Sequence, residues 1–194
     1  MLKNTERNYG AIARFLHWST ALLFLGAYMA VYYRHWLTDK GTPENWTALQ
    51  LHLSLGLSIA VLVVLRVIWT LSNKSPVHEP GSRWAHLAAR LGHIALYGVL
   101  IVMPLTGYLG TGVATDWFFL GEVPKFADTT LFKTVVEGQL GLSFEQFEAP
   151  IDFIHKKGGA WVVWVLILGH AGAALYHHFV LKDRTLVKMT RGKG

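Results

Sequence analysis

The chain has 194 residues, of which 52% are hydrophobic and only 15% charged, with a net charge of +6 and no cysteine. Soluble domains usually carry about 25% charged residues, so this composition favours a membrane protein, and its long apolar stretches argue against nucleic-acid binding. Without cysteine there is no disulfide, iron–sulfur cluster, thiolate ligand or covalently attached haem.

Four apolar stretches follow in chain order, each reaching the ~20 residues that cross a ~30 Å hydrocarbon core. They run over Ala13–Trp36, Ala48–Leu71, Leu91–Ala114 and Ile151–Leu181. Only helices pair every backbone group within one such segment. The expected fold class is therefore all-α, an integral membrane four-helix bundle that forms one domain over residues 1–194. The first stretch is too long for a signal peptide and shows no clear cleavage site.

The distribution of Lys and Arg predicts the orientation. With both termini on one side, twelve of these residues, from Lys3 to Lys193, lie on that side and six on the other. The positive-inside rule then places both termini in the cytoplasm, as expected for a multi-pass protein of the bacterial inner membrane.

The outer segment 115–150 mixes Phe and Val with acids, and we interpret it as one or two short amphipathic pieces on the bundle or in the interface. A soluble linker is the alternative. Pro104 and Gly107 predict a kink in the third span.

Four histidines lie within apolar stretches, where an ionisable side chain usually marks a site. They are His17, His52, His155 and His170. A single membrane histidine is equally well explained by an interhelical hydrogen bond. The four together favour two pairs, because His155 and His170 are about 60° apart around one helix and ~22 Å apart along it. His52 then meets His155 near the outer side, and His17 meets His170 near the inner side.

Two imidazoles that face each other across a bundle can supply both axial nitrogens of one haem, and bundle cores hold such cofactors. The residues four positions after these histidines are all small, which leaves room for a porphyrin, although close helix packing also favours small residues. They are Ala21, Gly56, Gly159 and Ala174. We therefore predict two b-type haems, with iron ligated by His52 and His155 and by His17 and His170.

Other charged residues fall beside these pairs. Arg14 is one turn before His17, and Arg66 lies at the level of the inner pair, so either can neutralise haem propionates or simply anchor its helix. His177 and His178 are too far from His155 for the ligand role, and we expect them at the inner face, either at a quinone site or as interfacial residues. His93 fits a packed histidine better than a quinone pocket. His35, His78 and His86 fit interface or loop positions.

Several motifs resemble the bacterial cytochrome b561 family, which shares its four-helix dihaem core with cytochrome b subunits of formate dehydrogenases and nickel–iron hydrogenases. The matching pieces cover the chain except the outer segment: RFLHW at 14–18, LHLSLG at 51–56, RLGHIALY at 90–97, GH at 169–170, ALYHHF at 174–179 and KDRTL at 182–186. The resemblance implies the same two haem pairs and quinone chemistry near His177 or His178. It also implies one activity known in the family, in which superoxide outside is oxidised and ubiquinone is reduced.

The chain departs from the family pattern in two ways. The two histidines of the last helix are commonly 14 residues apart in the family but 15 here, and a π-bulge at Gly158-Gly159 would absorb the extra residue. The outer side carries more acids than bases, whereas a positive funnel speeds the capture of an anion. Lys156 and Lys157 can still form a local basic mouth for superoxide, with further basic side chains nearby: Arg34, His35, Lys125 and Lys133.

These features predict an oxidoreductase of the superoxide:quinone type that works in the lipid bilayer without an obligatory partner subunit. A small redox donor on the outer side gives an electron to the His52/His155 haem, and the electron passes through the His17/His170 haem to ubiquinone. Two alternatives remain open: a cytochrome b subunit fed by a dehydrogenase or hydrogenase, and a histidine-lined metal or proton transporter. A purely structural membrane protein does not explain four histidines at paired depths.

Overall fold

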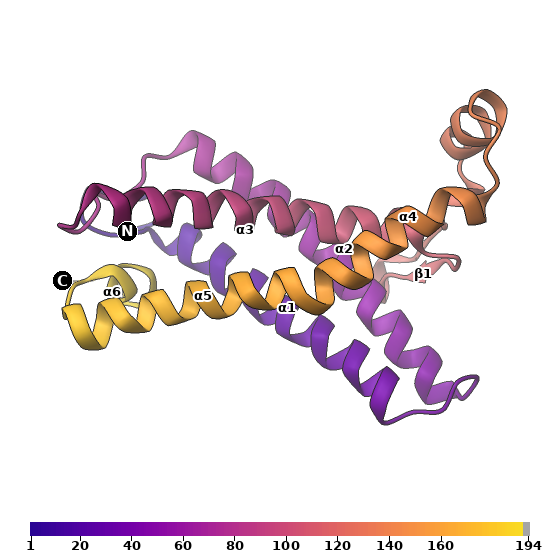
Figure 1. The fold of residues 1–194 in the computed structure, drawn as a ribbon, viewed down its shortest axis with the longest axis horizontal. Coiled ribbons are helices and arrows are strands. Elements are labelled where there is room, and N and C mark those ends of the chain that lie inside the picture. Colours follow the sequence, from indigo (N-terminus) through magenta and orange to yellow (C-terminus); the bar gives the residue numbers. More distant parts are fainter. Residues whose placement is uncertain (192–194) are drawn as a thin grey trace.

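The computed structural model describes residues 1–191, so Lys193, counted on the inner side above, lies outside the described residues. Its helices α1 (Ala11–Trp36), α2 (Pro43–Ser72) and α3 (Arg83–Gly110) are followed by a fourth long helix over 144–181. All four are long and apolar enough to cross a membrane. This confirms the predicted all-α membrane bundle. The N-terminus and residues 185–190 lie at the same end of the molecule (Figure 1), which we call the inner end after the predicted orientation.

Local sequence signals explain where the helices begin. Thr42 caps α2 by accepting a hydrogen bond from the Asn45 backbone N–H, and Pro43 occupies the first helical position. Ser82 caps α3 in the same way through Ala85. Such side chains satisfy backbone N–H groups that have no partner inside the helix. In Figure 1, α1 and α2 form an antiparallel hairpin. Its small core contains Ala27, Ile59 and Val63.

The third span begins earlier and ends earlier than predicted, because α3 covers Arg83–Gly110 rather than 91–114. The chain then doubles back along α2. A two-stranded antiparallel sheet follows, formed by β1 (Thr115–Asp116) and β2 (Glu122–Val123) with Thr115 opposite Val123. Between the strands lies the 3-10 turn η1 (Phe118–Leu120).

Polar side chains spaced four apart on α2 hold this returning segment. The Gln50 amide binds the backbone of residues 114 and 116 at 3.0 and 2.9 Å, and the Ser54 hydroxyl donates to the Asp116 carbonyl at 2.7 Å. Ser58 accepts a hydrogen bond from the Trp117 indole at 3.0 Å. Irregular backbone at membrane depth persists only where protein groups pair it. The stripe of Gln50, Ser54 and Ser58 supplies that pairing and explains why the third helix stops early.

The rest of the outer segment is a small aromatic core and not a linker. The 3-10 turn η2 (Phe126–Asp128) and the π-helical segment η3 (Phe132–Gln139) bury Phe126, Phe132 and Val136. These side chains pack against Tyr108 near the end of α3 and Phe144 at the start of α4, which fastens the third span to the fourth.

The fourth long helix is not uniform. Ser143 and Gln146 form a capping box that starts α4 (Phe144–Lys157). A π-helical segment, η4 (Gly158–Val162), separates α4 from α5 (Val163–Tyr176), and a second one, η5 (His177–Leu181), ends the span. The predicted π-bulge at Gly158-Gly159 is therefore confirmed. A short helix, α6 (Thr185–Thr190), follows.

At the inner end, the last helix folds back onto the other segments. The Trp18 indole donates to the Met189 carbonyl at 3.1 Å, and Arg184 donates to the Asn8 side chain at 3.2 Å. Lys188 is buried and forms an ion pair with Glu79 of the α2–α3 loop. The N-terminal segment, the inner loop and α6 are thus tied together.

Candidate functional site

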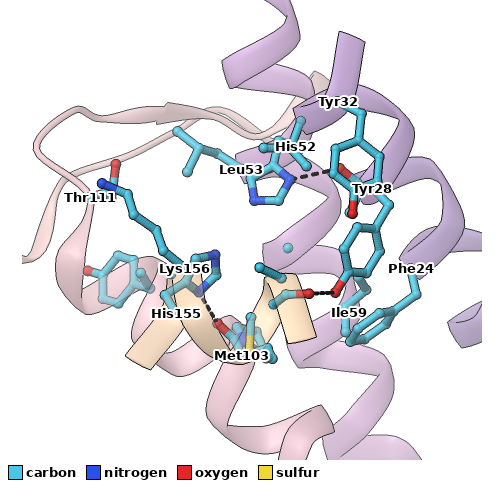
Figure 2. A pocket seen from close by; sticks show the side chains of 18 of the residues that line it. Phe24, Tyr28, Tyr32, His52, Leu53, Ile59, Met103, Thr111, His155 and Lys156 are labelled. Atoms are coloured by element: carbon cyan, nitrogen blue, oxygen red, sulfur yellow. Dashed lines mark hydrogen bonds between the residues drawn. The ribbon is translucent and has the colours of Figure 1, made fainter. Parts of the chain in front are cut away.

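The structure brings His52 of α2 opposite His155 of α4 toward the outer end of the bundle. Their ring centroids lie 6.1 Å apart and their planes are at 81°. Figure 2 shows the two imidazoles on facing sides of one pocket. The pairing matches the one that helix periodicity predicts.

Both outer imidazoles are held by backbone carbonyls. His52 Nδ1 lies 2.9 Å from the Ala27 carbonyl oxygen, and His155 Nδ1 lies 3.0 Å from that of Met103. A carbonyl can only accept, so each Nδ1 carries the proton and each Nε2 keeps its lone pair. Metal-ligating histidines are oriented by bonds of this kind. Both side chains are therefore prepared to bind a metal through Nε2.

The outer pair lines a cavity of about 510 Å³, within the 300–1,000 Å³ typical of cofactor sites. Gly56, Gly107 and Gly159 are among its lining residues. A Cβ atom at Gly107 would lie 3.0 Å from the His155 ring, and one at Gly159 would lie 3.2 Å from Met103. A side chain at Gly107 or Gly159 would therefore crowd the wall of the cavity.

The inner pair repeats the outer distance. His17 of α1 and His170 of α5 have ring centroids 6.1 Å apart, with planes at 69°. Arg66 of α2 approaches His17 Nδ1 at 3.4 Å and also lies over the Tyr97 ring. His93, expected to be a packed histidine, has its ring 5.7 Å from that of His170. The inner site is therefore richer in imidazole and carries a guanidinium, whereas the outer site is anchored by carbonyls.

One local irregularity lets both pairs use the same helix. The π-helical η4 lies between His155 and His170, and it takes up the extra residue that separates them. Tyr28 of α1 donates its hydroxyl proton to the Gly159 carbonyl at 2.7 Å, which anchors this turn to the first helix. Sequence reasoning missed Tyr28 and Met103, because neither follows a motif and both act through contacts between distant segments.

Only some of the basic residues predicted at the outer mouth line the outer cavity. Lys156 and Lys157 both line the outer cavity, but Lys156 forms an ion pair with Asp152 at 2.6 Å. His35 joins them in the cavity wall. Arg34 is engaged by Asn45 and Lys125 by Asp128, and neither they nor Lys133 line the cavity.

On the inner side, Arg66 lies beside His17, as noted above, whereas Arg14 makes no side-chain hydrogen bond or ion pair with the described residues 1–191. His177 pairs with Asp183, a residue that sequence reasoning did not single out. His178 lies against the Phe179 ring.

The four histidines fit axial ligation of a metal-centred cofactor. At the ~2.0–2.1 Å typical of imidazole–metal bonds, one ion shared by two facing rings holds their centroids about 6 Å apart, as both pairs do. The fixed Nδ1 protons of the outer pair and the open cavity between its rings agree with this. The fold and the site thus define a class: a helical membrane protein with facing imidazole couples inside its bundle.

Comparison with known proteins identifies the family. The family model described as prokaryotic cytochrome b561 matches residues 8–192. Cytochrome b561 homolog 2 of Escherichia coli (strain K12) is 31% identical over 192 residues, which cover 96% of this chain and 93% of that protein. Cytochrome b561 homolog 1 of the same strain is 32% identical over 178 residues, 90% and 92% of the two chains. The probable superoxide oxidase CybB of Yersinia pestis is 26% identical over 187 residues, 95% and 96% of the two chains.

This chain therefore belongs to the prokaryotic cytochrome b561 family. It is a multi-pass bacterial membrane protein that transfers electrons, and its family binds b-type haem. Family membership confirms the resemblance described above and argues against a metal transporter or a purely structural membrane protein.

Proposed function

We propose that the protein is a dihaem superoxide:ubiquinone oxidoreductase of the bacterial inner membrane, with both termini in the cytoplasm and no obligatory partner subunit. The observation that carries this proposal is the pair of equal 6.1 Å gaps, His52–His155 and His17–His170, one toward each end of the bundle. Each couple would hold one b-type haem, and the bound haems would supply one-electron redox chemistry. The 26% identity to a probable superoxide oxidase supports the choice of substrate.

The outer cavity supports the entry of a small anion. Lys157 and His35 line it, and Lys156 adds a charge that Asp152 partly offsets. Local basic groups raise the concentration of an anion at a site even when the wider surface is acidic. We assign Lys156 and Lys157 to this mouth, and His177 and His178 to the region where the quinone is protonated at the inner end.

The test of this function is stopped-flow mixing of the purified protein with superoxide, monitored by haem absorption. We expect rapid haem reduction, and re-oxidation when ubiquinone is added. Lys157→Glu should slow the reduction about tenfold at low ionic strength, and less at high salt, because the steering field is screened. Lys133→Glu makes the same charge change away from the cavity and should have little effect. Haem that superoxide leaves oxidised would remove the proposed substrate and leave a cytochrome b subunit as the alternative.

The surroundings of the two pairs favour electron flow from the outer site to the inner one. Arg66 places a positive charge beside the inner pair, and positive charge stabilises the reduced form of a redox group. The carbonyl bonds to His52 and His155 increase electron donation from these imidazoles to a bound metal, which favours the oxidised form. In a redox titration, Arg66→Gln should lower the inner midpoint potential by about 40 mV, which corresponds to ~1 kcal/mol for one electron. The outer potential should stay the same. An unchanged inner potential would show that Arg66 has no part in this ordering.

A further inference from the structure

The end of the last span carries a histidine–carboxylate pair that the haem sites do not use. His177 Nδ1 lies 2.5 Å from Asp183 Oδ2, with exposed side-chain fractions of 33% and 15%. A carboxylate accepts, so Nδ1 carries the proton and Nε2 is the nitrogen left to exchange protons with another molecule. The pair is thus an imidazole whose tautomer is fixed.

A left-handed residue at the end of the last span brings Asp183 back to His177. Lys182 adopts a left-handed conformation with φ 54°, and the Asp183 N–H returns to the His177 carbonyl at 3.1 Å. Asp183 Oδ1 accepts the Thr185 backbone N–H at 2.8 Å, and this bond fixes the carboxylate against the start of α6. Burial alone would raise the pKa of Asp183, but the hydrogen bonds from His177 and Thr185 outweigh it and lower that pKa.

His177 also lies on the side of the helix that carries His170. Seven residues separate them, which is about 20° of rotation and ~10 Å of rise in a helix. His178 is about 100° further around. Within residues 1–191, His178 has no side-chain hydrogen bond, and its ring lies against Phe179. The two neighbouring histidines are therefore not equivalent.

We propose that Asp183 is a positioning residue that makes His177, rather than His178, the proton donor to the quinone. This rests on the proposed function. Reduction of one quinone to its quinol takes two electrons, supplied by oxidation of two superoxide ions to dioxygen, and two protons from the inner aqueous side. His177 Nε2–H gives a proton to a quinone oxygen and is reprotonated from water, while the Asp183 carboxylate stays ionised and stabilises the imidazolium.

The test separates the two half-reactions in the intact haem-loaded protein. Protein reduced with dithionite is mixed with a soluble ubiquinone analogue, and haem re-oxidation is followed over a range of quinone concentrations. Asp183→Asn removes the charge but can keep the turn, because Asn and Asp form the same backbone-capping turn. We expect kcat to fall at least fivefold with KM within twofold, and haem reduction by superoxide to be unchanged. Asp183→Glu should recover part of the rate.

Two further variants, His177→Gln and the double variant with Asp183→Asn, test the same inference if one of the variants does not fold. His177→Gln should show the same defect, and the double variant should be no worse than either, because the two residues act as one unit. Asp128→Asn at the outer end is the matched control. Normal kcat in Asp183→Asn, or additive defects in the double variant, would overturn the role of Asp183. If wild-type reduced haem is not oxidised by the quinone, the proposed function itself fails.

Discussion

Replacing His52 or His155 with leucine is expected to remove one of the two haems, leaving about half the absorption of the wild type in reduced-minus-oxidised spectra. The two rings face each other across 6.1 Å, and each is fixed so that only Nε2 can bind iron. Leucine preserves an apolar volume but offers no ligand. Replacing His17 or His170 should remove the other haem.

His35→Leu is the matched control. His35 lines the same outer cavity, but its Nδ1 is bonded at 2.8 Å to the Val31 carbonyl of its own helix, and within residues 1–191 its ring is not stacked against another imidazole. We expect this variant to keep both haems. Wild-type pigment in His52→Leu would be incompatible with the ligand assignment.

Changing the length of the fourth helix at the π-helical turn should also change the haem content strongly, but only when a residue is inserted and not when one is deleted. Deleting Gly158 places His155 and His170 14 positions apart instead of 15, and a regular α-helix then brings them within about 40° of one face. We expect this variant to keep both haems. Inserting one alanine after Gly159 rotates His170 by about 100° relative to His155, and η4 already absorbs one extra residue. The insertion should therefore lose half or more of the haem.

Haem quantified by pyridine haemochrome per mole of purified protein measures both outcomes. An alanine inserted after Gly41, in the turn between α1 and α2, is the control for insertion as such, because a Cβ atom at Gly41 would contact no other segment within 4 Å. If deletion and insertion are tolerated equally, the π-turn does not set the register of the two pairs.

Much of the fold could be predicted because lipid restricts the choices. The four spans follow from apolar length and the two histidine pairs from helix period. The π-turn was implied by the resemblance to the family, whose two histidines in the last helix are commonly one residue closer together. The early end of α3 could not be predicted in this way, since residues 111–114 contain neither a charged residue nor a proline that would mark the end of a span. What ends it is a hydrogen-bonding stripe on another helix. Gln50 and Ser54 bind backbone atoms of the segment that follows α3, and Ser58 accepts a hydrogen bond from the Trp117 indole of the same segment.

The site shows the same limit. His52 and His155 can be recognised in the sequence because they are ionisable groups in apolar stretches. The carbonyls of Ala27 and Met103 that orient them have no sequence signature. The pairing of Lys156 with Asp152, one turn earlier, was readable from the spacing alone. The role of Asp183 was hidden because it depends on a left-handed residue, Lys182, at the end of the span.

The chain is built as two helical hairpins, α1 with α2 and the third span with the fourth. Each proposed ligand couple takes one histidine from each hairpin: His52 and His155 in one, His17 and His170 in the other. Neither cofactor is held within a single hairpin. In lipid no hydrophobic force draws helices together. Because each haem would be ligated from both hairpins, the two haems would hold together two hairpins that are inserted independently. Cofactor loading and final closure of the bundle would then be a single event in the assembly of this protein.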